Sequence, residues 1–377
     1  MLPFPLLCAL THAAEVGLTV QPQLSLDLAS DRPGEDSVEN YTWIRAWAEG
    51  REGQARWFIE ARTLHVVLIG DDIESVVDPD LGETGISLPV GPLYITAGHL
   101  IERWGRLDLL PVADVLNGRD LRAGPQTPLA FSRLPTAMVT AELPWSWGRA
   151  ELVWAPVPGV NRTSVQGTDW SLVRQGMIEG LVEDIETWEA DALGSEQVQG
   201  LLVAAGAGLS DDDPWTRWQQ SESLSQAGLP LAFGPQSDLA MRVSGGAGRV
   251  DAALLGGWLR TRQGAVVVDK SLVSYLREER LPGITEIEEL EGSLSEPYAV
   301  LAPRGPVVGA ELSGMLGPIG LRAEGLWRKR AVVTQQWLQA TTREELSTGL
   351  GADYAWGSWV VAVEGSWRRI GEAEDLL

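Results

Sequence analysis

Apolar and polar residues alternate over unusually long stretches of this chain. In the clearest stretch, residues 15–29, the even positions are apolar and the odd positions are mostly polar. Successive side chains of a β-strand point to opposite faces, so the pattern predicts a two-faced strand of about 14 residues. Soluble strands average about 5–6 residues, whereas a tilted strand that crosses a bilayer needs roughly 9–11. The apolar positions are Val16, Leu18, Val20, Pro22, Leu24, Leu26 and Leu28.

The same period returns at residues 55–62, 319–328, 346–354 and 359–368. In these stretches, charged residues occupy the face opposite the apolar one. In a soluble sandwich that face would meet ordinary solvent, and in a barrel it would line a wet lumen. The predicted lumen-facing charges are Arg56, Glu60, Arg62, Arg322, Glu324, Arg328 and Glu364.

Tryptophan and turn placement favour the barrel. The chain has 17 Trp but only 4 Phe and 5 Tyr. Short turns near residues 50–53, 144–148 and 356–358 alternate with longer polar inserts, as in membrane barrels with short turns at one end. We therefore predict an all-β, antiparallel, up-and-down transmembrane β-barrel of about 12–14 strands, even in number. Its interfacial girdle is predicted to include Trp327, Trp337, Trp356, Trp359 and Trp367.

Residues 1–14 are predicted to be a signal peptide, because residues 2–10 are apolar and Ala13 or Ala14 offers a small-residue cleavage site. No Lys or Arg precedes the apolar stretch, so we expect the natural start to lie upstream. Residues 15–377 are predicted to form one barrel domain. Its last residues do not form a strand with a terminal aromatic residue, so we expect a truncated reading frame and a barrel incomplete at the C-terminus. Long loops are predicted at about 70–92, 105–135, 156–198, 209–236 and 263–297, with short helices in residues 170–194 and 270–280.

Charge and cysteine content narrow the possible functions. The 52 acidic residues outnumber 29 basic ones, for a net charge of −23, which argues against a general nucleic-acid binder. The single cysteine, Cys8, allows no internal disulfide. Acidic groups at residues 71–80 and 211–213 lack the ordered ligand spacing of a calcium loop, so we interpret them as solvated surface. No metal or other cofactor is predicted.

The sequence offers little for catalysis. Of its three histidines, His12 lies in the expected signal peptide, and His65 and His99 lie in strand patterns. There is no Gly-x-Ser-x-Gly motif, no Cys/His metal spacing and no phosphate loop. We therefore expect no enzymatic activity.

Residues 94–122, with the sequence YITAGHLIERWGRLDLLPVADVLNGRDLR, begin as a strand and continue as a loop. Its Asp and Asn residues favour turns and caps, and its Arg residues can pair with the carboxylates. The loop is either a surface loop pinned by Arg–Asp pairs or an inward loop whose charges narrow the lumen. The candidate residues are Arg103, Arg106, Asp108, Asp114, Asn117, Arg119, Asp120 and Arg122.

This segment resembles a family of proteobacterial porin-like outer-membrane proteins, in which a strand ends in Arg-Trp-Gly and is followed by Asp, Pro, Asp-Val-Leu-Asn and Arg-Asp. Residues 133–135 and 153–158 are also similar to that family, and the resemblance covers about residues 90–170. It implies an exported outer-membrane barrel, with passage of hydrophobic or lipid-like molecules. The matching residues are Arg103, Trp104, Gly105, Asp108, Pro111, Asp114, Val115, Leu116, Asn117, Arg119 and Asp120.

Pattern and resemblance together predict a channel or transport scaffold in the outer membrane of a Gram-negative bacterium, in contact with its lipid. Three other hypotheses stay open: a soluble or surface-associated β-rich protein that binds a ligand or glycan through Trp, an outer-membrane enzyme, and a barrel with a plugged lumen. Conductance would separate a channel from a plugged barrel, because plugging depends on loop conformation.

Overall fold

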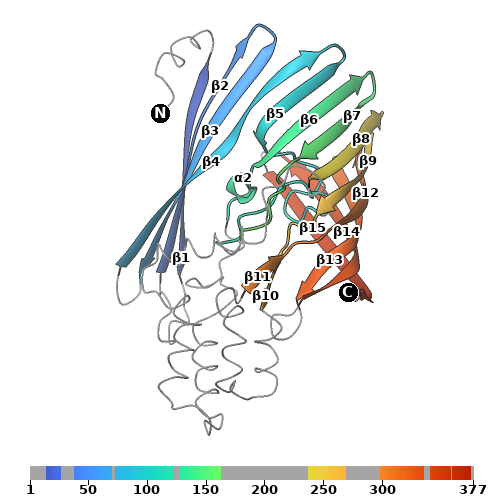
Figure 1. Cartoon of the computed structure of the whole chain (residues 1–377). Helices are drawn as coiled ribbons and strands as arrows, with labels where there is room; N and C mark the ends of the chain where they lie inside the picture. Colours follow the sequence, from blue (N-terminus) through green and yellow to red (C-terminus); the bar gives the residue numbers. More distant parts are fainter. Residues whose placement is uncertain are drawn as a thin grey trace.

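One long antiparallel sheet dominates the computed structural model (Figure 1). The structure describes residues 14–26, 38–69, 73–122, 127–162, 237–268, 298–334, 340–357 and 359–374. Within them, 13 strands follow one another in chain order, each hydrogen-bonded to the next and antiparallel to it. The predicted all-β, up-and-down arrangement is therefore confirmed.

The strands are 8 to 18 residues long. The first seven are β1 (Glu15–Leu26), β2 (Val38–Glu52), β3 (Ala55–Ile69), β4 (Ile73–Val90), β5 (Leu93–Leu100), β6 (Thr136–Trp145) and β7 (Gly148–Ala155). The other six are β8 (Asp238–Ala247), β9 (Val250–Arg260), β12 (Arg304–Leu316), β13 (Ile319–Thr334), β14 (Ala340–Trp356) and β15 (Trp359–Glu374). A separate small sheet pairs β10 (Ala265–Val268) with β11 (Tyr298–Leu301), and one short helix, α2, spans Leu129–Ser132.

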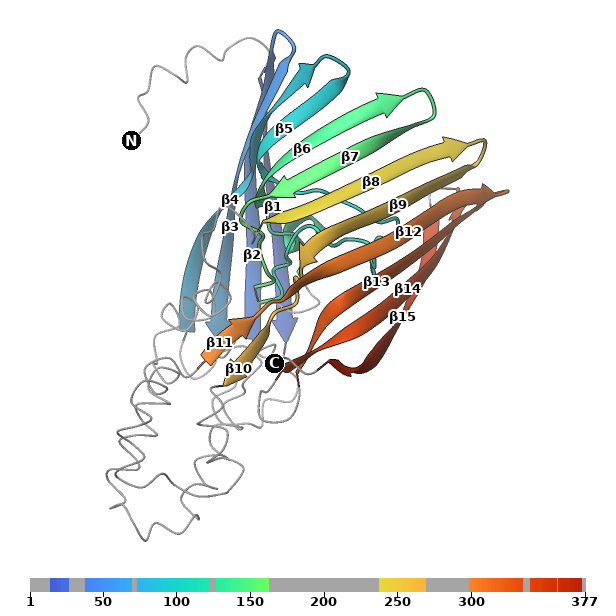
Figure 2. The same cartoon turned by 45° about the vertical axis from the view of Figure 1, so that its right-hand side comes forward.

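The sheet curves into a wall that is open between β1 and β15 (Figures 1 and 2). Thirteen strands lie within the predicted range of 12–14, but the number in the described residues is odd rather than even. Because neighbours alternate in direction, an odd number makes both edge strands run the same way. An antiparallel ladder therefore cannot join β1 directly to β15.

Tight hairpin turns gather at one end of the wall (Figure 1). Gly53, Gly91, Gly248, Gly317 and Gly357 begin five of these turns with φ between 60° and 65°. Glycine adopts this left-handed conformation without a Cβ penalty, which suits two-residue hairpins. We call the end with these turns the short-turn end.

The prediction of a loop over residues 70–92 was wrong, because residues 73–90 form β4. Two of its acidic residues, Asp78 and Asp80, lie on the inward face and pair there with arginines distant in sequence. The predicted loop over 263–297 likewise contains strand β10. Residues 1–13, both predicted helices, the loop at 209–236 and Trp337 lie outside the described residues.

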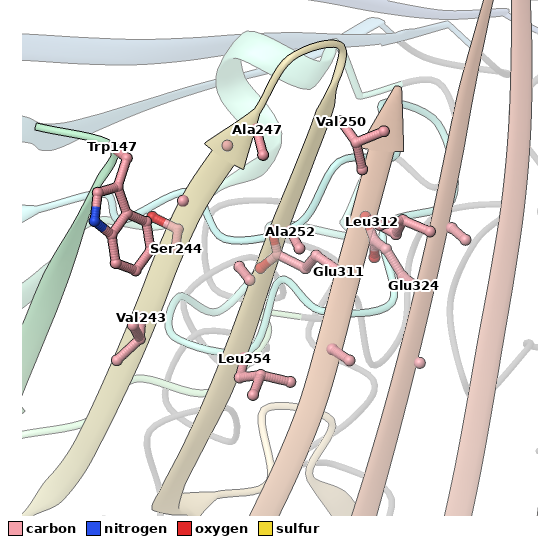
Figure 3. Close-up of a pocket in the computed structure, with 16 residues that line it drawn as sticks. Trp147, Val243, Ser244, Ala247, Val250, Ala252, Leu254, Glu311, Leu312 and Glu324 are labelled. Atoms are coloured by element: carbon pink, nitrogen blue, oxygen red, sulfur yellow. The ribbon is translucent and has the colours of Figure 1, made fainter. Parts of the chain in front are cut away.

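The two faces of the wall differ as the alternation predicts. On β1, the outward side chains of Val16, Leu18, Val20 and Leu24 are 78%, 68%, 54% and 58% exposed. Figure 3 shows the same division at β8, β9, β12 and β13, where Leu254 is outward and Glu311 and Glu324 are inward. The wall is thus a single layer with an apolar outer surface and a charged inner surface.

Two apolar clusters are buried inside the curve. The larger joins the loop after β5, through Trp104, Val115 and Leu116, to inward side chains of the wall such as Leu255 and Leu326. The smaller packs Phe131 of α2 against β2 to β4, with the rings of Tyr41 and Trp43 stacked 5.6 Å apart. These clusters hold the residues between β5 and β6 against the concave face.

Candidate constriction site

Residues 101–122 and 127–135, between β5 and β6, lie inside the curve of the wall and are called the inner loop (Figure 2). Asn117 holds both of its ends. Its Oδ1 accepts the Glu102 N–H at 2.8 Å, and its Nδ2 donates to the Leu100 and Leu134 carbonyls, both at 2.9 Å. This fully buried amide therefore fixes where the inner loop leaves β5 and rejoins β6.

Three glutamates of the wall hold residues 105–113. Glu324 of β13 accepts the N–H groups of Arg106, Leu107, Val112 and Ala113, the last two at 2.7 Å. It is 4% exposed, and the hydrogen bonds compensate for burial of its charge.

The other two glutamates take the remaining N–H groups. Glu364 of β15 accepts Asp108, Leu109 and Leu110 at 2.9, 2.8 and 3.0 Å, and Glu311 of β12 accepts Gly105 at 3.2 Å. Every backbone N–H from Gly105 to Ala113 thus has a wall carboxylate as its partner. Pro111 is the one residue of this run without an N–H.

Glycines on β14 make room for this segment. A Cβ on Gly349 would lie 2.4 Å from Leu107 Cδ1, and one on Gly351 would lie 2.8 Å from Leu107 Cδ2. Both glycines are at inward positions, opposite Glu324 and Arg322 in register. The wall is therefore shaped to receive Leu107.

Side-chain ion pairs hold the later part of the inner loop. Asp114 Oδ2 lies 2.7 Å from Arg133 Nε and 3.3 Å from Arg119 Nη2. Arg122, 2% exposed, reaches Asp120 at 2.6 Å and Asp78 of β4 at 2.8 Å. Nearby, Arg162 reaches Asp80 of β4 at 2.8 Å. The pairs made by Arg122 and Arg162 therefore connect β4 to arginines that are distant from it in sequence.

Protonation of two inner-loop carboxyls follows from these surroundings. Burial by itself would raise the pKa of Asp120, but the adjacent Arg122 guanidinium outweighs it and holds that pKa below its usual value. Burial, followed by repulsion from Glu151 and Glu83, raises the pKa of Glu102 from 4.5 to about 7. Asp120 is therefore held in its ionised form, whereas Glu102 takes up its proton much nearer to neutral pH than a solvated carboxyl does.

The eight predicted loop residues divide into two groups. Asp114, Asn117, Asp120 and Arg122 are engaged with the protein itself, as described above. Asp108 is 73% exposed and pairs with Arg322 at 2.5 Å, Arg119 is partly exposed, and Arg106 reaches Glu311 at 3.4 Å rather than a loop carboxylate. Arg103 is exposed, and within the described residues no ion pair holds it.

The seven predicted strand charges lie on the inward face, in register with one another or with other inward residues. Arg56 is near the short-turn end, beside Glu49. Glu60 and Arg62 form a buried pair on β3, and Arg62 also donates to the Arg133 carbonyl at 2.8 Å. Arg322, Glu324, Arg328 and Glu364 lie on β13 and β15.

Several inward charges were not predicted from the sequence. Glu311 accepts two hydrogen bonds from Arg242 of β8, at 3.0 and 2.7 Å. Asp238 of β8 pairs with Arg262 at 2.7 Å and with Arg304 at 3.2 Å. The available signal was the alternation itself, since Glu311 stands between the outward residues Ala310 and Leu312.

The described residues contain no group of three or more potential metal-ligating side chains, and none of their helices could cross a membrane. Among the described residues, His65 Nε2 lies 2.9 Å from Ser75 Oγ on the neighbouring strand, and no carboxylate is paired with His65. A His–Ser contact alone lacks the orienting acid that such chemistry requires.

No protein-family model matches the sequence, and no curated protein is significantly similar to it. The family resemblance of residues 90–170 therefore stays a prediction.

Three solved porin structures are similar in arrangement. OmpF of Salmonella typhi in complex with daunomycin has a TM-score of 0.44 and 9% identity, over 96% of this chain and 82% of that one. An anion-selective porin from Comamonas acidovorans has a TM-score of 0.39 and 11% identity, over 95% and 80%. OccK2 (OpdF) of Pseudomonas aeruginosa in complex with glucuronate has a TM-score of 0.37 and 8% identity, over 95% and 67%. Because all three TM-scores are below 0.5, the function of this chain has to be argued from its own residues.

Proposed function

We propose that this chain forms the wall of a porin-like channel in the outer membrane of a Gram-negative bacterium, with the inner loop as its constriction. The supporting observation is the division of the wall into an apolar outer face and a charged inner face. Exposed apolar patches on soluble monomers rarely exceed a few hundred Å². Here, large apolar side chains are exposed on the outward face of strand after strand, from Val16 on β1 to Trp367 on β15.

The spacing of the outward tryptophans along the strands supports a wall that spans a membrane. Trp258, Trp327 and Trp367 each lie eight residues beyond the first residue of β9, β13 and β15, which begin at the short-turn end. Eight residues extend about 27 Å along a strand, or about 20 Å along the axis of a barrel tilted by roughly 40°. Trp147, Trp356 and Trp359 lie at the short-turn end itself and are at least 64% exposed. Two Trp levels at this spacing suit the apolar band of about 25 Å in outer-membrane barrels.

The inner face favours ions and small polar solutes over the hydrophobic or lipid-like molecules that the family resemblance implied. Arg56, Arg322 and Arg368 are examples of charges on that face whose side chains are partly exposed. A water-filled passage can hydrate such charges, whereas an apolar solute would have to strip their water. The soluble alternative requires the opposite burial, because two packed sheets would cover the apolar face.

Substitution of an outward residue by arginine distinguishes a wall that meets lipid from one that meets water. Leu254 is 68% exposed in the middle of β9, and Val250 is 50% exposed on the same face at the short-turn end. If the face meets lipid, Leu254→Arg should reduce the free energy of unfolding in liposomes by about 2–4 kcal/mol, and Val250→Arg by about 0–1 kcal/mol. Equal and negligible losses would mean that this face meets water and would overturn the membrane assignment.

Cell fractionation and planar-bilayer recording complete the test. The protein should be recovered in the outer-membrane fraction, migrate differently on gels before and after heating, and conduct ions. A correctly inserted protein without conductance would identify the inner loop as a plug and remove the channel function.

A further inference from the structure

A cavity of about 320 Å³ lies between the inner loop and the inward face of β13, β14 and β15. Its charged lining consists of four arginines and two carboxylates, an excess of two positive charges in a chain whose net charge is −23. The arginines are Arg119, Arg262, Arg328 and Arg368, and the carboxylates are Asp114 and Glu345. Its size is at the lower end of the range for small-molecule sites.

Both carboxylates are already engaged by the protein. Asp114 Oδ2 is shared by Arg119 and Arg133, whereas its buried Oδ1 has no hydrogen-bond partner among the described residues. Glu345 lies 2.6 Å from Arg368 Nη2 and accepts the Ser347 hydroxyl at 2.7 Å. Both carboxylates are thus paired with arginines, and the cavity lining keeps its excess of two positive charges.

The arginines are engaged to different degrees. Arg262 donates to the Val115 carbonyl, the Gly159 carbonyl and Asp238, all within 2.9 Å. Arg328 of β13, which is opposite Glu345 in register, has a buried Nε without a hydrogen-bond partner in the part of the chain that the structure describes. No ion pair within 4.0 Å holds it there either. A buried donor without a partner is costly, and an anion in the cavity would relieve that cost.

Apolar side chains from the inner loop line the same cavity. Leu110 is 44% exposed, and Val112 is half-buried beside it, with Leu326 of β13 also in the lining. An inorganic anion makes no use of these side chains. A carboxylate with a short hydrocarbon tail matches both the arginines and the apolar surface.

We propose that this cavity binds small aliphatic carboxylates, with Arg328 as the principal contact to the carboxylate group. Arg368 and Arg119 flank it, and Leu110 and Val112 contact the tail. The inference rests on the proposed channel, since it makes the cavity a solute site beside the constriction. Binding is nevertheless measurable on purified protein in detergent, independently of conduction.

Isothermal titration with butyrate, acetate, butyramide and inorganic phosphate tests the site. Butyrate should bind more tightly than acetate or phosphate, and butyramide should not bind measurably. Arg328→Gln should weaken butyrate binding by about tenfold or more, through loss of a charge-assisted hydrogen bond. Arg328→Lys should retain part of the affinity. Arg330→Gln removes an exposed arginine of the same strand that is outside the cavity lining, and should leave affinity unchanged.

Equal butyrate affinity of the wild type and Arg328→Gln would overturn the assignment to Arg328. Equal affinity for butyramide would overturn the anion requirement, and equal affinity for phosphate would overturn the role of the apolar surface. Circular dichroism of each variant confirms that it has folded. Conductance without butyrate binding would overturn the proposed site and leave the channel proposal intact. Butyrate binding without conductance would overturn the channel proposal and leave the site intact.

Discussion

The two parts of the inner loop are held against the same wall by different chemistry. Residues 105–113 contribute backbone N–H groups to the carboxylates of Glu311, Glu324 and Glu364. Residues 114–122 and 127–133 are held by arginine–aspartate pairs and by backbone hydrogen bonds such as that from the Asp120 N–H to the Ser132 carbonyl. The path of the first part therefore depends on where the wall places its glutamates, and that of the second depends on ion pairs and backbone contacts.

The second part of the inner loop should show the largest effect of a single substitution. Arg122→Ala would leave Asp78 and Asp120 buried without their shared guanidinium. Breaking a buried pair in this way costs about 3–5 kcal/mol, measurable by denaturant unfolding in detergent. Arg149→Ala is the control, since Arg149 is 47% exposed in its pair with Glu151 and should cost about 0–1 kcal/mol. Similar losses for both variants would contradict the importance of burial.

The first part of the inner loop should respond to a substitution in the wall. Glu324→Gln removes the charge that accepts four N–H groups, and we expect a loss of about 2–3 kcal/mol. The amides of Leu107, Val112 and Ala113 should then exchange with deuterium faster, while those around Asp120 change little. Glu345→Gln is the matched control, because Glu345 accepts hydrogen bonds from side chains alone among those described. Uniformly faster exchange throughout the inner loop would mean that the two parts are not separate.

This difference explains how far the sequence could predict the structure. The strands and their outward faces follow from alternation, a local property, and so does the inward placement of Glu324 and Glu364. The acidic residues of β4 were misread because Asp78 is neutralised by Arg122, 44 positions away. An acidic run whose counter-charges are distant in sequence looks like a solvated loop.

The site was less predictable than the wall. The motif residues Asp114, Asn117 and Asp120 were recognised as important, but their partners could not be identified, because those pairings depend on how the loop folds. The glutamate contacts of residues 105–113 were invisible, because a backbone N–H leaves no mark in the sequence. Only Pro111, which lacks that group, hints at which positions contribute.

A smaller effect is expected where the wall accommodates the inner loop. Gly349→Ala would place a Cβ 2.4 Å from Leu107 Cδ1 and 3.0 Å from Val112 Cγ2. Overpacking of this kind costs about 1–3 kcal/mol, and the flexible end of Leu107 favours the lower part of that range. Gly325→Ala on β13 is the control, since its Cβ would meet nothing within 4 Å. Truncation of Leu107 to Ala in the Gly349→Ala background should relieve the clash, so a double variant with fully additive losses would contradict it.

The smallest effect concerns Glu102, where the inner loop leaves β5. Its pKa is raised from 4.5 to about 7 in the fold by burial and by the neighbouring glutamates. Between these two values the folded state binds more protons than the unfolded state, so stability falls as pH rises through this window. Glu102→Gln lacks this titration, so its free energy of unfolding should not fall in this way. The difference in unfolding free energy between variant and wild type should therefore be more favourable to the variant at pH 8 than at pH 5, as measured by unfolding at both pH values. The Glu102 N–H bond to Asn117 is a backbone contact and survives the substitution, so the loop should keep its path. If the stability difference between wild type and variant is the same at pH 5 and pH 8, Glu102 does not titrate in this window, and the inner loop begins in better solvated surroundings than its burial implies.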